Sequence, residues 1–514
     1  MTSRFTHPSR TPSSPLYAVA MAATLATAIP ATGLAGSPPL DLGLDTPLRP
    51  STGYLNDYLR ADDPYMAAWN LGVQYRARYE IKENGGATGA GSGTDFSAKP
   101  GVLNDNSYLL QKTLIRVGYT AQWFEVFAQA RNSSSTNDKR PSTGALPGSG
   151  AGPESDGPLD LHQAYIGIGN HKEFPVSAKV GRQELSYGEE RLVGAFAWNN
   201  VGRVFDAAKL RWQNPWFSGD FFSSRLVLPD DNNFNTSNDY DYFSGAYLTS
   251  KKLPTLLTDV YFLARNASPQ AASPGPRSPF TVGSARDIYT VGARFVSATN
   301  DWGNINFFVD GAYQFGHFND PAITTASARS LKQEAYMAIA NASYTWQEAA
   351  FVPKVGLEYC FGSGDSNPND GKHQTFENLF PTNHKFYGFA DFASLQNLHD
   401  LRFFSSIKPY SRLTLLAEAH LMWLADTHDN FYSVTGARRG GIAATPGTGY
   451  GINAGYGSEL GAETDLVATW ALSPYISIEA AYCHFFRGSY VKDSLSAIKS
   501  QDADYVYLQT SLSF

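Results

Sequence analysis

The chain has 514 residues, a formal net charge of −7 at pH 7, and aromatic residues at 14% of its length. The negative charge argues against a nucleic-acid-binding protein, which normally presents a basic surface. The 46 glycines and the many aromatic residues are typical of β-strands joined by tight turns, so the composition favours an all-β fold.

Residues 1–35 have the organisation of a secretory signal peptide. Arg4, His7 and Arg10 precede an apolar run from Leu16 to Ile29, and the small residues ATGLAG follow it, with cleavage expected near Ala35. A membrane anchor is the alternative, although the run is short for a bilayer span. No later apolar stretch reaches the roughly 20 residues of a transmembrane helix, so an exported chain that enters a membrane must do so as a barrel.

The stretch LGVQYRARYEIK alternates between two kinds of side chain. The positions from Leu71 to Ile81 in steps of two are mostly apolar or aromatic, whereas Gln74, Arg76, Arg78, Glu80 and Lys82 lie on the other face. The same period of two recurs at 304–314 and 412–423. These segments exceed the usual globular strand of five or six residues, and such alternation is typical of a membrane-spanning strand.

About eighteen such segments follow one another, the number of a porin-sized barrel. They begin near Asn70, Tyr108, Ala121, Asp160, Val176, Arg203, Phe217, Tyr240, Leu256, Arg286, Trp302, Lys332, Phe351, Asp400, Ser411, Gly457, Pro474 and Ala503. Short connections follow the even-numbered segments and long polar ones follow the odd-numbered segments. This sorting predicts a transmembrane antiparallel β-barrel over residues 70–514, with short periplasmic turns, long extracellular loops and an N-terminal periplasmic segment at 36–69.

Charged residues are distributed unevenly over the expected inner face. Strand parity places many bases on the first seven strands, opposed mainly by Glu80 and Glu125, and several acids on the late strands. The bases are Arg76, Arg78, Lys82, Lys112, Arg116, Arg131, Arg203, Lys209, Arg211 and Arg225, and the acids are Glu459, Glu463, Asp465 and Glu479. A basic wall attracts anions and offers forked donors to carboxylates. The alternative is that the two walls pair and stiffen the barrel.

Two blocks of sequence resemble the alginate export family of outer-membrane porins. They are GRQELSYGEERLVGAFAWNNVGRVFDAAKL, from Gly181 to Leu210, and DGKHQTFENLFPTNHKFYGFADF, from Asp370 to Phe392, and the resemblance extends from about Asn70 to Phe514. It implies an eighteen-stranded barrel whose arginine-lined lumen passes an anionic polyuronate. It also implies that Arg182, Arg191 and Arg203 contact the polymer, and that Trp198 and Asn199 shape the loop. The last strand, ending in Phe514, resembles the terminal signal read by the outer-membrane assembly machinery.

We therefore expect a monomeric channel in the outer membrane of a Gram-negative bacterium that conducts anionic saccharides or related acidic solutes. The alternative is a general or uptake porin for small anions. Expected partners are the saccharide cargo, outer-membrane lipid, the assembly machinery and periplasmic secretion components, with no nucleic acid and no cofactor. The expected lumenal binding residues are Arg76, Arg78, Arg116, Arg182, Arg191, Arg203, Lys209, Arg211 and Arg225.

Two weaker motifs and two cysteines complete the analysis. Glu184, Glu189 and Glu190 offer carboxylates for acid/base cleavage of a polysaccharide, but no catalytic signature accompanies them, and we expect no enzyme. In GDSNPNDG, Asp365, Asn367 and Asn369 have the alternate oxygen spacing of a calcium loop, but Asp370 replaces its glycine and no closing glutamate follows, which favours a polar turn. Cys360 and Cys483 fall on distant segments, so we expect two free thiols.

Overall fold

The computed structural model describes residues 53–86, 95–97, 104–140, 153–170, 172–230, 234–253, 255–268, 285–298, 301–319, 330–436, 438–439 and 445–514. The expected signal peptide lies outside these residues, as does the first part of the expected periplasmic segment. The described chain begins with a helix, α2 (Tyr54–Asp62), and a 3-10 helix, η2 (Pro64–Ala68). No described helix is both long and apolar enough to cross a bilayer.

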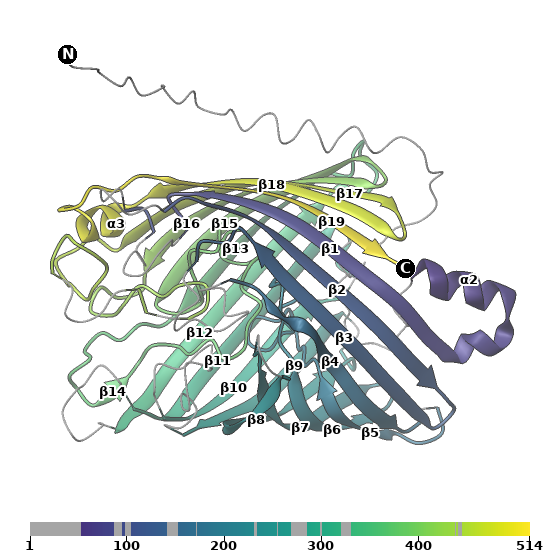
Figure 1. Cartoon of the computed structure of the whole chain (residues 1–514). Helices are drawn as coiled ribbons and strands as arrows, with labels where there is room; N and C mark the ends of the chain where they lie inside the picture. The colour runs from purple at the N-terminus through teal and green to yellow at the C-terminus, as the bar shows by residue number, and fades with distance from the viewer. Residues whose placement is uncertain are drawn as a thin grey trace, which may run out of the picture.

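Eighteen long antiparallel strands form a closed barrel (Figure 1). They are β1 (Trp69–Glu83), β2 (Asn106–Thr120), β3 (Phe124–Thr136), β4 (Asp156–Ile168), β5 (Val176–Gln183), β6 (Phe205–Gln213), β7 (Phe217–Leu228), β8 (Thr236–Ser250), β9 (Leu256–Ala267), β10 (Arg286–Ser297), β11 (Ile305–Asn319), β12 (Ser330–Thr345), β13 (Lys354–Gly362), β15 (Leu398–Tyr410), β16 (Leu413–Leu424), β17 (Glu459–Ser473), β18 (Ile476–Arg487) and β19 (Ala503–Ser513). This order confirms the segments predicted from the sequence.

The barrel closes because the last strand pairs with the first. β19 pairs with β1 in a register that sets Ser513 opposite Gln74, and the Phe514 amide donates to the Val73 carbonyl. Every long strand therefore has two neighbours, which leaves no open sheet edge. A short nineteenth strand, β14 (Lys372–His373), adds a parallel pairing to β12.

Alternating side chains divide the wall into an outer and an inner face. On β11 the side chains of Ile305, Val309 and Tyr313 are exposed on the outside, while Asp310 and Gln314 are buried inside. The predicted facing of the segments at 71–82, 304–314 and 412–423 is confirmed in this way. Exposed tryptophans gather at the short-turn end of the barrel, as the aromatic girdle of a membrane barrel requires: Trp69, Trp123, Trp212, Trp216, Trp302, Trp346 and Trp470.

The connections sort onto the two ends of the barrel. Two residues separate β15 from β16 and β17 from β18, whereas residues 184–204, 363–397 and 425–458 form long loops at the opposite end. The short helix α3 (Ser489–Ser494) lies at the long-loop end, and α2 lies beside the C-terminus at the short-turn end (Figure 1). Cys360 and Cys483 are buried free thiols on β13 and β18, which confirms the prediction.

Candidate functional site: two loops inside the barrel

The 184–204 loop, which joins β5 to β6, folds into the lumen and binds the first strands. The Arg76 guanidinium donates to the Ala197 carbonyl at 2.9 Å, and the Lys112 ammonium donates to the carbonyls of Ala197 and Asn199, each at 3.1 Å. The Arg78 guanidinium donates to the Trp198 carbonyl at 2.8 Å. Basic side chains of the predicted basic wall therefore donate their hydrogen bonds to carbonyls of the loop. These bonds hold the loop against β1 and β2.

The 363–397 loop, between β13 and β15, also packs inside the barrel. Its amide at Phe380 donates to the Leu192 carbonyl at 2.9 Å, and the Gly194 amide donates back to the Phe380 carbonyl at 2.8 Å, so the two loops share a short stretch of backbone pairing. Its aromatic side chains are almost fully enclosed: Phe376, Phe380, Phe386, Tyr387, Phe389 and Phe392. The two sequence blocks that carry the family resemblance therefore contain the loop segments that meet inside the lumen.

An aromatic stack joins the two loops to the barrel wall. The centre of the Arg78 guanidinium lies 3.5 Å from the centroid of the Trp198 ring. The His384 ring lies 3.5 Å from the same ring, tilted by only 6°. Two groups this close cannot share one face of an indole, so Trp198 is sandwiched between them. Tyr507 of β19 meets Trp198 edge-on at 5.0 Å.

The arginines expected to contact the polymer are engaged within the protein. The buried Arg203 guanidinium donates to the carbonyls of Phe380, Pro381 and Gly194, at 2.6, 2.9 and 3.0 Å. Burial lowers the pKa of Arg203 to about 9. Arg191 pairs with Glu358 of β13 at 2.7 Å, where the negative charge outweighs burial and raises the pKa of Arg191. Arg191 thus joins the 184–204 loop to the barrel wall, and Arg203 joins that loop to the 363–397 loop.

Two buried glutamates form further ion pairs between the loops and the barrel wall, and neither was predicted from the sequence. Glu358 accepts from Arg191 and also from Arg402 of β15, at 3.1 Å. Glu377 of the 363–397 loop binds Arg265 of β9 and Arg286 of β10, each at 2.7 Å. Glu377 lies within the second sequence block, and this position was the one feature of the sequence that could have indicated its role. Loss of one partner would leave a buried charge uncompensated.

A basic cluster on β5 and β6 is less completely neutralised. Lys179 and Lys209 are directly opposite each other across the two strands. Lys209 and Arg211 share one carboxylate, Asp220 of β7, at 3.6 and 3.3 Å. Their side chains are 20% and 34% exposed. Like charges opposite each other on a sheet repel, so the positive charge of this cluster is only partly balanced by Asp220. Lys179 was not among the predicted bases.

Arg182 and Arg225 lie on the outer face, not in the lumen as we expected. Directly opposite neighbours in a sheet share a face, and the register runs from Arg182 through Asp206 and Arg225 to Tyr242, which is exposed outside. Arg182 binds both oxygens of Asp206, at 2.8 and 3.0 Å. For Arg225 the parity was misread because adjacent aromatic residues in β7 leave its facing ambiguous, and a shift of one position exchanges the two faces. The lumenal place of Arg182 was implied by the family resemblance and not by parity.

Arg116 lies apart from the two loops. The Arg116 guanidinium donates to the Asn70 side chain at 3.0 Å, near the short-turn end.

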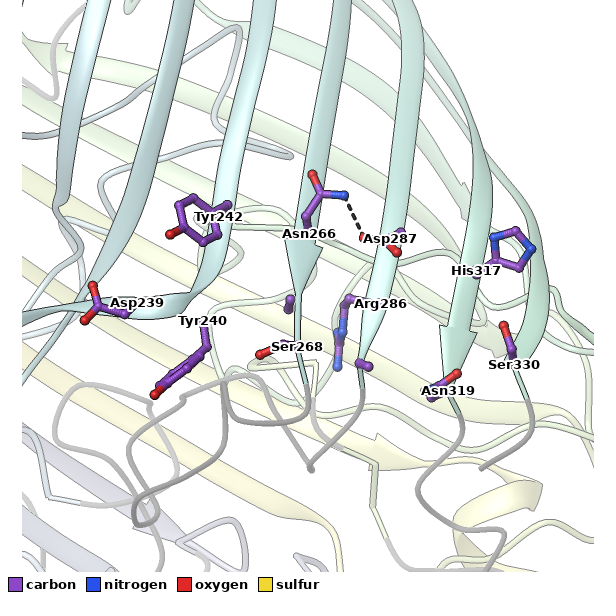
Figure 2. A pocket seen from close by; sticks show the side chains of 12 residues that line it. Asp239, Tyr240, Tyr242, Asn266, Ser268, Arg286, Asp287, His317, Asn319 and Ser330 are labelled. Carbon is purple, nitrogen blue, oxygen red and sulfur yellow. Dashed lines mark hydrogen bonds between the residues drawn. The ribbon is translucent and has the colours of Figure 1, made fainter. Parts of the chain in front are cut away.

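A surface pocket of about 720 Å³ lies at the long-loop end of the barrel, along β8 to β12, where Asn266, Asp287 and His317 are successive cross-strand neighbours. Figure 2 shows the Asn266 amide donating to Asp287, a bond of 2.7 Å. None of the residues that line this polar pocket belongs to the 184–204 or 363–397 loop.

The carboxylates of the first block are directed to different partners. Glu184 lies 3.0 Å from the His162 ring, Glu189 lies 3.6 Å from Arg191, and Glu190 accepts from Thr382 at 2.7 Å. They do not form the paired acid and base that glycoside cleavage requires.

The acidic segment at 365–370 forms consecutive turns. The Asp365 and Asn367 side chains accept from the backbone amides of Asn367 and Asn369, at 3.1 and 3.2 Å. Asp429 of the 425–458 loop accepts from the Asp365 amide at 3.0 Å. Burial, and then the charge of Asp429, raises the pKa of Asp365 to about 6. The segment therefore joins two loops through an acidic contact.

Comparisons with known proteins agree with this architecture. A family model described as Alginate export matches residues 68–502. The solved structure of Pseudomonas aeruginosa OpdL is 10% identical, with a TM-score of 0.51 over 87% of this chain and 99% of that one. Acinetobacter baumannii OccAB2 is 12% identical, with a TM-score of 0.51 over 87% and 98%. At such identities the likeness establishes the fold alone. A search of curated proteins finds no match.

Proposed function

This chain belongs to the alginate export family, and on that premise we propose that it passes anionic saccharides, such as an alginate-like polyuronate, across the outer membrane. Family and fold are those of an outer-membrane channel. The proposal concerns the cargo and the residues that select it. Its main support is the cluster of Lys179, Lys209 and Arg211, in which Lys209 and Arg211 share the single carboxylate of Asp220 and Lys179 lies opposite Lys209.

The cluster has the charge and exposure that a carboxylated solute requires. Lys209 and Arg211 share the carboxylate of Asp220. Lys179 lies 3.9 Å from the centroid of the Tyr165 ring, whose hydroxyl donates to Glu125 at 3.1 Å. Most other lumenal bases described above donate to loop carbonyls or buried carboxylates, so they are less available to a solute. We therefore propose that the cluster on β5 and β6 attracts anions, and that Arg78, Arg191 and Arg203 hold the loops in place.

Reversal potentials in planar bilayers test this assignment. The double variant Lys209→Gln/Arg211→Gln should lose much of the anion preference, most clearly at low salt, because charges are screened beyond about 10 Å at 0.1 M. Arg225→Gln is the matched control, since Arg225 lies on the outer face of the adjacent strand. Unchanged selectivity in the double variant, with wild-type folding, contradicts the proposal.

A porin for small anions is the second candidate function. The binding of the 184–204 and 363–397 loops inside the barrel favours it. Arg191 and Arg203 tie the 184–204 loop to β13 and to the 363–397 loop, so two bound loops stand in the lumen through which a polymer would pass. Single-channel recordings separate the two cargoes. Oligouronates of increasing length should produce lengthening blockades if the polymer is the cargo. Current carried equally by monomeric sugar acids, without length-dependent blockades, favours the small-anion porin.

A further inference from the structure

A buried acidic cluster lies on the inner face of β16, β17 and β18, apart from the basic cluster described above. Register sets Glu418 opposite Asp465, His420 opposite Glu463, and Asp465 opposite Cys483. Each of these five side chains is at most 8% exposed. Of the acidic wall predicted from the sequence, Glu463 and Asp465 belong to this cluster, whereas Glu459 is exposed at the start of β17 and Glu479 accepts from Tyr507 at 2.9 Å.

The histidine is oriented by a carboxylate behind it. His420 Nδ1 lies 3.1 and 3.0 Å from the two oxygens of Asp400, which is fully buried on β15. A proton on Nδ1 donates to that carboxylate and leaves the lone pair on Nε2, directed toward the cluster. Metal-binding histidines are commonly held in this way, with the second nitrogen bonded to a carboxylate.

The atoms that face Nε2 lack hydrogen-bond partners. Glu418 Oε2 and Asp465 Oδ2 lie 3.6 and 3.8 Å from Nε2, too far for hydrogen bonds. Among the described residues, Nε2, Glu418 Oε2, both oxygens of Asp465 and Glu463 Oε2 have no partner of acceptable geometry. Buried polar atoms without partners are rare because burial without compensation is costly.

We propose that Glu418, His420 and Asp465 bind a divalent transition-metal ion such as Zn²⁺. Their donor atoms all lie within 4.8 Å of one another. Four-coordinate zinc, with bonds of about 2.0–2.2 Å, holds its ligand atoms roughly 3.4 Å apart, so small side-chain adjustments close the site. An imidazole ligand favours zinc and its neighbours over calcium or magnesium. Glu463 and Cys483 flank Asp465 and supply further ligand atoms.

The site lies beneath the 363–397 loop and gives the metal a structural role. Glu463 Oε1 accepts from the Ala390 amide at 2.8 Å. Gly388 has a positive φ of 86°, and a Cβ there would lie 2.4 Å from the Glu463 carboxylate, so only glycine permits this approach. A cation that neutralises the cluster would therefore stabilise the loop above it. The alternative to a bound metal ion is that the buried carboxyl groups are neutralised by protons that they share.

Metal titration of the intact, untagged barrel in detergent tests the proposal, because a histidine tag would itself bind Zn²⁺. After treatment with a chelator, calorimetry with Zn²⁺ should give one site per chain. His420→Gln and Asp465→Asn should abolish that site, and Asp400→Asn should weaken it about 10–100-fold by releasing the imidazole. Co²⁺ should produce visible absorption bands that disappear in the same variants.

The control is His484→Gln, since His484 lies on the outer face of β18, bonded to Asp504 at 2.7 Å. It should keep the site. Far-UV circular dichroism and a thermal melt establish that each variant is folded, and Glu418→Gln replaces any variant that is not. Absence of stoichiometric Zn²⁺ binding to the wild type overturns the proposal in favour of shared protons. Unchanged binding in folded His420→Gln also overturns it.

Discussion

The guanidinium of Arg78 lies 3.5 Å above the Trp198 ring and donates at 2.8 Å to the carbonyl of the same residue. One side chain of the barrel wall thus holds both the ring and the backbone of a loop inside the lumen. Burial of a cation against an aromatic face is worth up to about 2 kcal/mol when both are desolvated. We therefore expect the position of the loop, as well as the charge of the wall, to affect conduction.

Trp198→Ala should release the 184–204 loop from Arg78 and His384. We expect a larger single-channel conductance and faster proteolysis of the loop, because the variant loses both stacking contacts. Planar-bilayer recordings of the purified variant measure the first effect. Trp216→Ala is the control, since Trp216 is exposed in the turn between β6 and β7. A conductance equal to that of the wild type contradicts the proposed role of the stack.

Arg203→Ala should loosen the contact between the two loops without altering ion preference. The change removes a donor from three carbonyls, of which that of Phe380 keeps its bond from the Gly194 amide. A buried carbonyl left without a donor costs about 1–3 kcal/mol. Hydrogen exchange of the amides at Gly194 and Phe380 should accelerate, whereas reversal potentials should match the wild type. A large loss of anion preference with slow exchange would instead give Arg203 the polymer-contacting role implied by the family resemblance.

Acid should stabilise the contact between the 363–397 and 425–458 loops. Burial raises the pKa of Asp429, and the pKa of Asp365 is raised to about 6 by burial and by the charges of Asp429 and Asp370. Each carboxyl therefore binds its proton more tightly in the folded loops than in unfolded chain, where the pKa is near 3.9. Stability is gained as the pH falls through about 6 and is complete below about 4.

Hydrogen-exchange protection around Asp365 and around Thr375, whose hydroxyl donates to Asp429, measures this dependence when the rates at about pH 4.5 and 7 are divided by the intrinsic rates at each pH. Asp365→Asn mimics the protonated carboxyl and should keep high protection at both values. Asp301→Asn, in the short turn before β11, serves as the control and should leave the dependence intact. Lower protection at the lower pH in the wild type reverses the expected sign and refutes the assignment.

The alternation of loops and turns predicts which sites a protease reaches from outside the cell. A cleavage sequence inserted at Gly449, where an added Cβ meets nothing within 4 Å, should be cut in intact cells. The same sequence at Gly303, in the turn before β11, should be cut only after the outer membrane is opened. Cleavage at Gly303 in intact cells would overturn the membrane topology.

Several residues of the candidate site were named from the sequence, but the contacts that they make were not predicted. Arg78, Arg191 and Arg203 were predicted to bind the cargo, and in the structure Arg78 binds the 184–204 loop, which itself carries Arg191 and Arg203. Their partners could not be inferred, because Glu358 and Phe380 are distant in the chain and come into contact only when two loops fold into the barrel. Strand parity likewise misplaced Arg225, since β7 offers no unambiguous alternation.

The sequence by itself determined the barrel, its strand count and the ends at which loops gather. Side chains alternate with a period of two, and a closed ring of strands is the solution that pairs every backbone group in a membrane. Only the tertiary structure decided where the charges go. Cross-strand register brought His420 between Glu418 and Asp465, set Lys179 against Lys209, and turned Arg182 outward. Those distances depend on how strands pair around the barrel, and a local pattern does not contain that information.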